Sequence, residues 1–311
     1  MLSPAHIAAG LGIIVLVGGA AAGAIHVQQQ QDEEHEIRVG AVSDQLRRDV
    51  SEHTTTISDP ARRGRRAAAA LRVLIAETVT GSERDDEAIE ADLSRRLEQL
   101  RDAADRLDSA TRHSVSRPDA LEFAGAQPLL RQLEDLETQA RATAATMRGS
   151  ANTAESISIA IRVLHRAAAE FVAGTDDLPE TDDPDAVAAA WRDELDRLDP
   201  YRQAAEAAAQ IESLANLAAA HLALIDDLQD SGTTALDHLE AGDVDAYNQH
   251  REAELEGADS LRDQLMEAMD ATMPKVVVDV EVAEEHALRL LNELEELRRQ
   301  TPAQLASARD G

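Results

Sequence analysis

Four arginines form the densest basic cluster in the chain: Arg62, Arg63, Arg65 and Arg66. They follow Ser58-Asp59-Pro60, where a capping residue and a first-turn proline predict the start of a helix. In the first turns of a helix the dipole disfavours cations, so a role in binding would explain their position. Guanidinium groups bind anions through paired hydrogen bonds. The pattern predicts an anion-binding or partner-docking site, with pairing to nearby carboxylates as the alternative.

A ligand that binds between helices needs polar side chains in the interior of the bundle. Arg72 and Arg162 each begin an Arg-Val-Leu triplet within a helical segment. Together with Arg65, they are the arginines that we expect to reach the interior and to contact the acid group of a small ligand.

No other set of residues predicts a reaction or a bound metal ion. The acidic loop from Thr175 to Asp183 lacks the alternating spacing and central glycine of a calcium loop, so we interpret it as solvated. His165 and His221 fall on or beside apolar stripes and are interpreted as core residues. The chain has no cysteine, and no phosphate-binding loop or catalytic triad is recognisable. We expect no enzymatic activity, no metal and no cofactor.

The composition constrains the partners and the habitat. The 311 residues include 60 acidic and 30 basic side chains, which gives a net charge of −30. Such a surface repels phosphate backbones, so we expect no nucleic-acid partner. Lys275 is the only lysine, and arginine supplies the other basic residues. An acidic excess with arginine in place of lysine indicates a halophilic protein, because molar salt screens repulsion between surface charges.

The first 27 residues predict a membrane anchor. Residues 7–25 are apolar and carry no charge. A helix of this length is just long enough to cross a bilayer. We interpret residues 1–27 as an N-terminal transmembrane anchor or uncleaved signal sequence; a signal peptide cleaved near Ala22-Gly23-Ala24 is the alternative. A single span followed by one large polar domain is a common extracytoplasmic layout. We therefore expect a single-pass membrane protein whose C-terminal domain is periplasmic or on the cell surface.

Apolar residues recur at helical spacing almost throughout residues 28–300, which predicts an all-helical bundle domain. Gly149 to Asn152 are expected to interrupt or bend a helix. An unusually regular stripe from Tyr201 to Ile225 predicts one broadly buried helix. Pro274 is expected to kink the last helix, which continues through the valine-rich residues 276–282. Residues 301–311 are expected to form a short flexible tail.

The predicted fold class is all-α, an elongated up-down bundle of about six to eight helices. The length of the bundle domain suggests two stacked four-helix modules that share long helices. A weak repeat agrees with this: Arg101 to Asp108 reads RDAADRLD, and Arg192 to Asp199 reads RDELDRLD.

The helical segments resemble the ectodomains of bacterial chemoreceptors and sensor histidine kinases. The resemblance rests on Ile161 to Asp177 (IRVLHRAAAEFVAGTDD), on Trp191 to Gln203 (WRDELDRLDPYRQ) and on the helix-Gly-Asp-helix hairpin within His238 to Leu265. It implies stacked four-helix modules that bind small organic acids or amino acids between helices. The chain departs from the family because no second span or signalling domain follows Leu297.

Two functions follow from these observations. The first is a membrane-anchored sensor-like domain that binds a small anionic ligand or a partner protein and lacks its own output domain. The second is a structural coiled-coil tether or scaffold that self-associates at the membrane. The apolar heptads from Met266 to Leu297 fit either function, and a homodimer or a membrane protein partner is expected in both cases.

Overall fold

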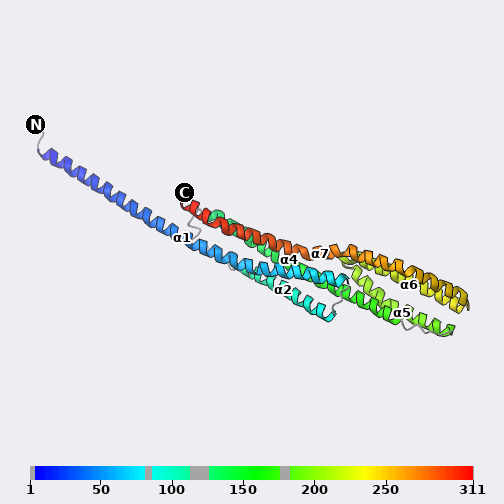
Figure 1. The fold of residues 1–311 in the computed structure, drawn as a ribbon. Coiled ribbons are helices and arrows are strands. Elements are labelled where there is room, and N and C mark those ends of the chain that lie inside the picture. The colour runs from blue at the N-terminus through cyan, green and yellow to red at the C-terminus, as the bar shows by residue number, and fades with distance from the viewer. Residues whose placement is uncertain (1–3, 81–85, 113–125, 176–182, 311) are drawn as a thin grey trace. The chain divides into compact units, whose positions relative to one another are not determined.

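The structure is a computed structural model that describes residues 4–80, 86–112, 126–175 and 183–310. Side chains are described for these residues except 4–32, 35, 86, 174–175, 255–259 and 308–310. The described residues form helices joined by short turns, so the predicted all-α class is confirmed (Figure 1). The helices are α1 (Pro4–Thr80), α2 (Asp86–Arg112), α4 (Gln127–Thr175), α5 (Pro184–Ala209), η2 (Glu212–Leu214), α6 (Ala215–Glu240) and α7 (Val244–Asp310).

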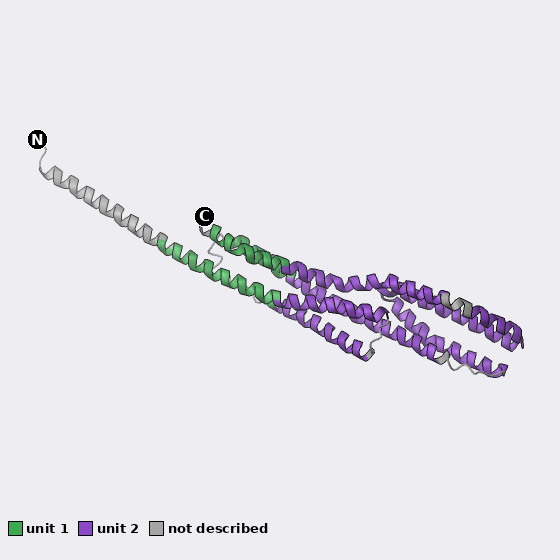
Figure 2. Ribbon diagram, viewed as in Figure 1, with its two compact units in different colours: residues 1–58, 110–139, 292–311 green, residues 59–109, 140–291 purple. Residues whose placement is uncertain are grey.

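The chain divides into two compact units, and each unit combines segments that are far apart in the sequence (Figure 2). Unit 1 comprises Met1–Ser58, Ala110–Gln139 and Asn292–Gly311. Unit 2 comprises Asp59–Ser109 and Ala140–Leu291. The boundary falls inside α1, α2, α4 and α7, so these helices each contribute residues to both units.

The predicted break at Ser58-Asp59-Pro60 is wrong, because α1 runs through Pro60 without interruption. A proline inside a helix removes one backbone hydrogen bond and crowds the carbonyl four residues earlier. Burial offsets that cost here: Ile57 and Ala61 are fully buried, and Pro60 is buried as well. The expected interruption at Gly149 to Asn152 does not occur either, since α4 continues through these residues and buries Ser150 and Ala151.

The regular stripe from Tyr201 to Ile225 is divided between two helices, so the single predicted helix is also wrong. Ile211 adopts an extended conformation (φ −99°, ψ 114°) between α5 and η2. Its N–H donates to the Ala208 carbonyl at 3.0 Å, and the Leu214 N–H donates to the Ile211 carbonyl at 2.9 Å. The turn lets α5 and α6 pack side by side as a hairpin, which buries both halves of the stripe. Neither glycine nor proline marks it in the sequence.

The turn at Gly242 and the helix at 276–282 agree with the prediction, whereas the C-terminal tail does not. Gly242 connects α6 and α7 with φ +71°, a conformation that favours glycine, and the predicted Gly-Asp turn is confirmed. Residues 276–282 are helical, as expected despite their valines. The expected flexible tail at 301–311 is instead the end of α7, which continues to Asp310. Thr301 and Leu305 are buried, and this burial explains why the segment stays helical.

The predicted membrane anchor lies within α1, but the side chains of residues 7–25 lie outside the described set. In the part of the chain that the structure describes, no helix is long and apolar enough to cross a membrane. The anchor at 1–27 therefore stays a prediction.

In unit 2, α1, α2, α4 and α7 contact one another. A Cβ atom on Gly64 of α1 would lie 2.6 Å from the Met147 Sδ of α4 and 3.4 Å from the Ala103 Cβ of α2. The Ser150 hydroxyl of α4 donates to the Asp279 carbonyl of α7 at 2.8 Å. Glycine and alanine at the crossing allow close approach, and the leucines and isoleucines of these helices fill the rest of this core.

A second group in unit 2 consists of α5 and α6 with the adjoining parts of α4 and α7. The Phe171 ring of α4 stacks on Tyr201 of α5, with centroids 6.1 Å apart. Trp191 of α5 packs with Ala235 and Leu239 of α6 and with Tyr247 of α7. Residues of α4 and α7 thus take part in both groups.

We predict that Gly64→Ala destabilises the protein by roughly 1 kcal/mol, because overpacking a filled core costs more than alanine gains in helix propensity. Met147 is fully buried, so its thioether end can make room for the added methyl group only by shifting within a filled core. Gly149→Ala is the matched control: its Cβ would meet nothing within 4 Å, and it should stabilise by about 0.5–1 kcal/mol.

Denaturant unfolding in molar salt measures both values. In a Met147→Ala background, the added methyl group at residue 64 should become neutral or stabilising, because the two changes are coupled. An equal effect of Gly64→Ala and Gly149→Ala would contradict the close approach of α1 and α4.

Candidate functional site

Unit 1 contains a cleft of about 210 Å³ between α1 and α7, which we call the α1/α7 cleft. The lining residues are Arg47, Val50, Ser51, Arg298, Thr301 and Pro302. Two arginines from different helices therefore line the same hollow. Within the described residues, neither arginine forms an ion pair with a carboxylate. The combination of positive charge, nearby hydroxyl groups and open volume suits a small anion.

Arg298 is held in place by neutral acceptors on α1. Its Nε donates to the Thr54 hydroxyl at 3.0 Å, and its Nη2 donates to the Ser51 carbonyl at 3.4 Å and to the Thr55 hydroxyl. These contacts orient the guanidinium group while leaving its charge uncompensated. A charge-assisted hydrogen bond to an anion therefore remains available to it.

Sequence analysis did not identify Arg47 or Arg298. They are separated by most of the chain, and each belongs only to an Arg-Arg pair, Arg47-Arg48 and Arg298-Arg299. Only the antiparallel packing of α7 on α1 in unit 1 brings them together. Thr301-Pro302 was no help, because residues 301–311 were expected to form a flexible tail. In the structure Pro302 lies inside α7.

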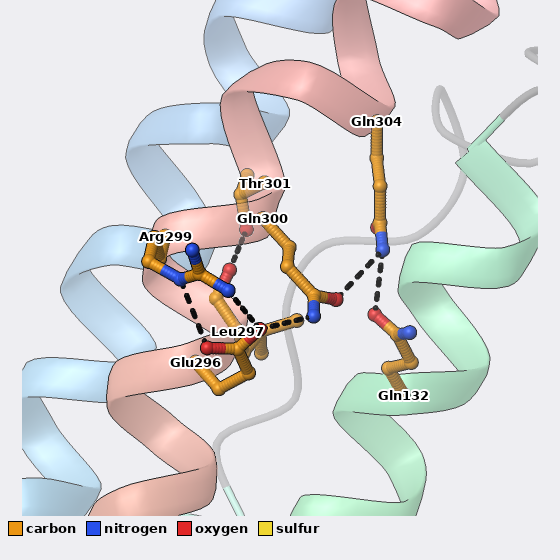
Figure 3. A network of polar contacts seen from close by, with 7 residues as sticks. All are labelled: Gln132, Glu296, Leu297, Arg299, Gln300, Thr301 and Gln304. Carbon is orange, nitrogen blue, oxygen red and sulfur yellow. Dashed lines mark hydrogen bonds and ion pairs between the residues drawn. The ribbon is translucent and has the colours of Figure 1, made fainter.

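A second cleft, of about 300 Å³, lies between α4 and α7 in unit 1 and is acidic. Its carboxylates are Asp135, Glu293 and Glu296. Figure 3 shows the amide network at its edge: Gln304 donates to Gln132 at 3.1 Å and to Gln300 at 3.3 Å. In the same view Arg299 lies against Glu296, with Nη2 and Oε1 2.6 Å apart, so this arginine is neutralised within α7.

A buried histidine–carboxylate pair connects α1 and α4 in unit 1. The His53 Nε2 lies 3.1 Å from the Glu137 Oε1, and both side chains are buried. Breaking such a pair leaves an uncompensated polar group in the core, so it constrains how these helices can pack.

The arginines predicted from the sequence are placed separately and line neither cleft. Arg62, Arg63 and Arg66 are exposed on α1, and Arg62 lies 4.0 Å from Asp59. Arg65 lies 3.9 Å from Glu284 of α7, so its charge is partly compensated.

The two interior candidates are paired with carboxylates of neighbouring helices. The Arg72 Nη1 lies 3.1 Å from the Glu281 Oε1, and its Nη2 lies 3.8 Å from Glu284. The Arg162 Nη1 lies 2.6 Å from the Glu90 Oε2 of α2. Four of the six predicted residues, Arg62, Arg65, Arg72 and Arg162, thus lie within ion-pair distance of carboxylates. None of them meets Arg47 or Arg298.

A polar cluster occupies the core of the α5, α6 and α7 group. The Arg251 guanidinium lies 5.4 Å from the Trp191 ring centroid, and its Nη1 donates to the Glu254 Oε2 at 3.1 Å. The neighbouring Glu194 is buried, and its Oε2 has no hydrogen-bond partner among the described residues. Burial raises the pKa of Glu194, and the Arg251 charge opposes that rise.

Ser231 and His250 lie next to this cluster but do not form a nucleophilic pair. The His250 Nε2 lies 2.8 Å from the Ser231 hydroxyl and 3.1 Å from the Ser231 carbonyl. The serine hydroxyl donates to Glu254. In that arrangement its proton points to the carboxylate and not to the imidazole, whereas a serine nucleophile gives its proton to an adjacent base.

The predicted core histidine His221 is buried, as expected, and is paired with Tyr201. The Tyr201 hydroxyl contacts the His221 Nδ1, and their ring centroids are 5.6 Å apart. Burial lowers the pKa of His221 to about 4, with the nearby His165 acting in the same direction. Burial raises the pKa of Tyr201 to about 12. Both groups are therefore neutral at pH 7.

Most of the acidic loop, residues 176–182, lies outside the described residues. Its last residue, Asp183, caps α5 through a 3.1 Å bond from the Asp185 N–H to its side chain. Among the residues that the structure describes, no group of three or more His, Asp or Glu side chains is arranged to hold a metal ion.

Comparison with protein-family models, curated proteins and solved structures gives no match. The resemblance to chemoreceptor and sensor-kinase ectodomains therefore stays a prediction, and the argument for function rests on the clefts.

We predict that the His221–Tyr201 pair makes the protein less stable as the pH falls. The pKa of His221 is about 4 in the folded state and about 6.5 when unfolded, so the unfolded chain binds more protons between these values. The free energy of unfolding should drop across that range by an amount on the order of 3 kcal/mol from this residue. Above pH 6.5 the contribution is fully present.

Denaturant unfolding from pH 7 to pH 4 measures this effect. His221→Asn keeps an acceptor near Tyr201 but cannot take up a proton, so its stability should depend less on pH. Carboxylates that titrate in the same range contribute equally to both proteins. Identical pH slopes for the two would show that His221 titrates normally.

Proposed function

We propose that this chain is a membrane-anchored, extracytoplasmic helical module that binds a small anionic ligand in the α1/α7 cleft and signals through a partner. The observation that carries this proposal is the pair Arg47 and Arg298, which face one cleft without a carboxylate partner in the described residues. In a chain with net charge −30, the arginines expected in the interior, Arg65, Arg72 and Arg162, lie near glutamates. Arg47 and Arg298 are exposed and share one cleft.

The electrostatics of the cleft favour an anion over a neutral ligand. Both arginines are exposed, and a guanidinium group binds best a partner that is also charged and planar, such as a carboxylate. The surrounding acidic surface opposes the approach of anions at low salt, but molar salt reduces the screening length to about 3 Å. The local positive charge then determines binding.

The size of the cleft favours a small organic acid. A volume of about 210 Å³ is below the range of drug-sized sites, which begins near 300 Å³. The walls are two helices, and Arg298 already contacts α1 before any ligand binds. A ligand between Arg47 and Arg298 would contact α1 and α7 together, so its binding energy would depend on how these two helices are placed.

The packing of α7 favours the ligand-binding module over the alternative function, a self-associating tether. A tether needs apolar heptads that are free to pair with another chain. Val276, Val280, Ala283, Ala287 and Leu290 are fully buried within unit 2. Leu294 and Leu297 are buried in unit 1. From Val276 to Leu297 the heptads are therefore already occupied by the chain itself, whereas Met266 at their start is exposed.

We predict that small organic acids raise the melting temperature of the whole protein in molar salt, because a ligand of the folded state stabilises it by mass action. Arg298→Gln and Arg47→Gln each remove one charge while keeping a hydrogen-bonding amide. Each should weaken binding at least about tenfold, since a bond to a charged group contributes roughly 1.5–3 kcal/mol.

Thermal unfolding and titration calorimetry measure the two effects. Arg66→Gln is the matched control, because Arg66 is an exposed arginine of α1 in unit 2. It should bind the acid as the unaltered protein does. Loss of binding in Arg66→Gln but not in Arg298→Gln would move the site to the arginine cluster. No binding of any acid, together with melting that depends on protein concentration, would favour the tether.

A further inference from the structure

A buried carboxylate lies in the α5, α6 and α7 group of unit 2 and belongs to neither cleft. Glu194 of α5 is only 8 % exposed, and its Oε2 accepts no hydrogen bond from the described residues. An ionised carboxylate in such a place loses its hydration without a hydrogen bond to that oxygen in return. A protonated carboxyl group is neutral and loses much less. The surroundings of Glu194 therefore favour its acid form.

The neighbouring cation of α7, Arg251, is engaged by a second carboxylate. Its Nη1 donates to the Glu254 Oε2 at 3.1 Å, and its guanidinium group lies 5.4 Å from the Trp191 ring centroid. The Ser231 hydroxyl of α6 also donates to Glu254. Two donors from different helices are thus directed at Glu254, and neither is directed at Glu194.

The charges around Glu194 come from α5 and α7. Burial is the largest cause that raises the pKa of Glu194 above the ordinary 4.5, and the Glu254 charge raises it further. The Arg251 charge opposes that rise, and Arg197 of α5 opposes it more weakly. The other titratable groups of the cluster are His238 of α6 and Tyr247 and His250 of α7. A test has to separate protonation of these histidines from protonation of Glu194.

The contact between α5 and α7 responds to the charge on Glu194. With its proton, the side chain stays buried between the helices. Without it, the carboxylate regains hydration only when α5 and α7 separate locally and admit water. Trp191 lies one turn before Glu194 on the same face of α5. Its indole N–H donates to the Tyr247 hydroxyl of α7 at 3.3 Å, so separation of the helices exposes the indole.

We propose that Glu194 makes the contact of α5 with α7 dependent on a proton: the protonated side chain keeps the two helices closed at Trp191, and loss of the proton opens them to water. This stabilisation is fully present below pH 4.5 and is lost as the pH rises through the raised pKa of Glu194. The contact lies in unit 2, whereas Arg47 and Arg298 lie in unit 1, so this proposal does not depend on ligand binding in the α1/α7 cleft.

Fluorescence of the whole, unlabelled protein tests the proposal, because Trp191 is the only tryptophan in the chain. Emission wavelength and quenching by acrylamide both measure the access of solvent to the indole. In molar salt from pH 4.5 to pH 8, the emission should move to longer wavelength and quenching should increase. Circular dichroism should stay unchanged, because the helices separate locally without unfolding.

Three substitutions assign the transition. Glu194→Gln has the shape of the protonated acid and no proton to lose, so Trp191 should stay shielded across the whole range. Glu254→Gln removes one negative charge and releases Arg251 to pair with Glu194, so the exposure of Trp191 at high pH should shrink. Glu206→Gln is the matched control, because Glu206 is an exposed glutamate of the same helix. It should leave the transition unchanged.

The unaltered protein alone tests whether the transition exists. A Trp191 that stays equally shielded at every pH would overturn the proposal. A transition of the same size in Glu194→Gln would assign it to His238 or His250 and would overturn the role of Glu194. A transition that is lost in Glu194→Gln, reduced in Glu254→Gln and kept in Glu206→Gln supports the proton-dependent contact.

Discussion

The packing of α7 against α1 and α4 is the interaction on which the rest of the structure depends. In unit 1 it aligns Arg298 with Thr54 and Gln304 with Gln132. In unit 2 it aligns Glu281 with Arg72 and Asp279 with Ser150. The buried aliphatic side chains of α7 provide most of the favourable free energy, at about 25 cal/mol per Å² of apolar surface removed from water. The polar contacts contribute less, but they fix one register, because a shift of one turn would break them.

That register creates the candidate site. Arg47 and Arg298 are distant in sequence and meet only because α7 lies antiparallel to α1. Two prolines inside long helices each remove one backbone hydrogen bond, and the consequences differ. Pro60 is buried, and its lost hydrogen bond is offset by the packing around it. Pro302 is exposed, so water can bond to the carbonyl that the proline leaves without its helical donor.

The sequence was sufficient to predict the helices, because their apolar periodicity is strong and the core positions from Leu71 to Leu297 follow it. The sequence predicted poorly where one helix ends and the next begins. Proline and glycine disfavour helices locally, but burial of neighbours outweighed that preference at Pro60 and Gly149. The turn at Ile211 has no local signal, since it arises from the packing of α5 on α6. The site was missed for the same reason: clustering in sequence pointed to Arg62 through Arg66, whereas Arg47 and Arg298 are brought together only by tertiary structure.

The central claim is that α1 and α7 are held in one register in unit 1, and a distance measurement tests it most directly. The chain has no cysteine, so spin labels can be attached to cysteines introduced at the exposed residues Arg48 and Arg299. Double electron–electron resonance on the whole protein in molar salt should give a single narrow distance distribution. A broad distribution, or two peaks separated by about one helical turn of 5.4 Å, would contradict a fixed register and the cleft built on it.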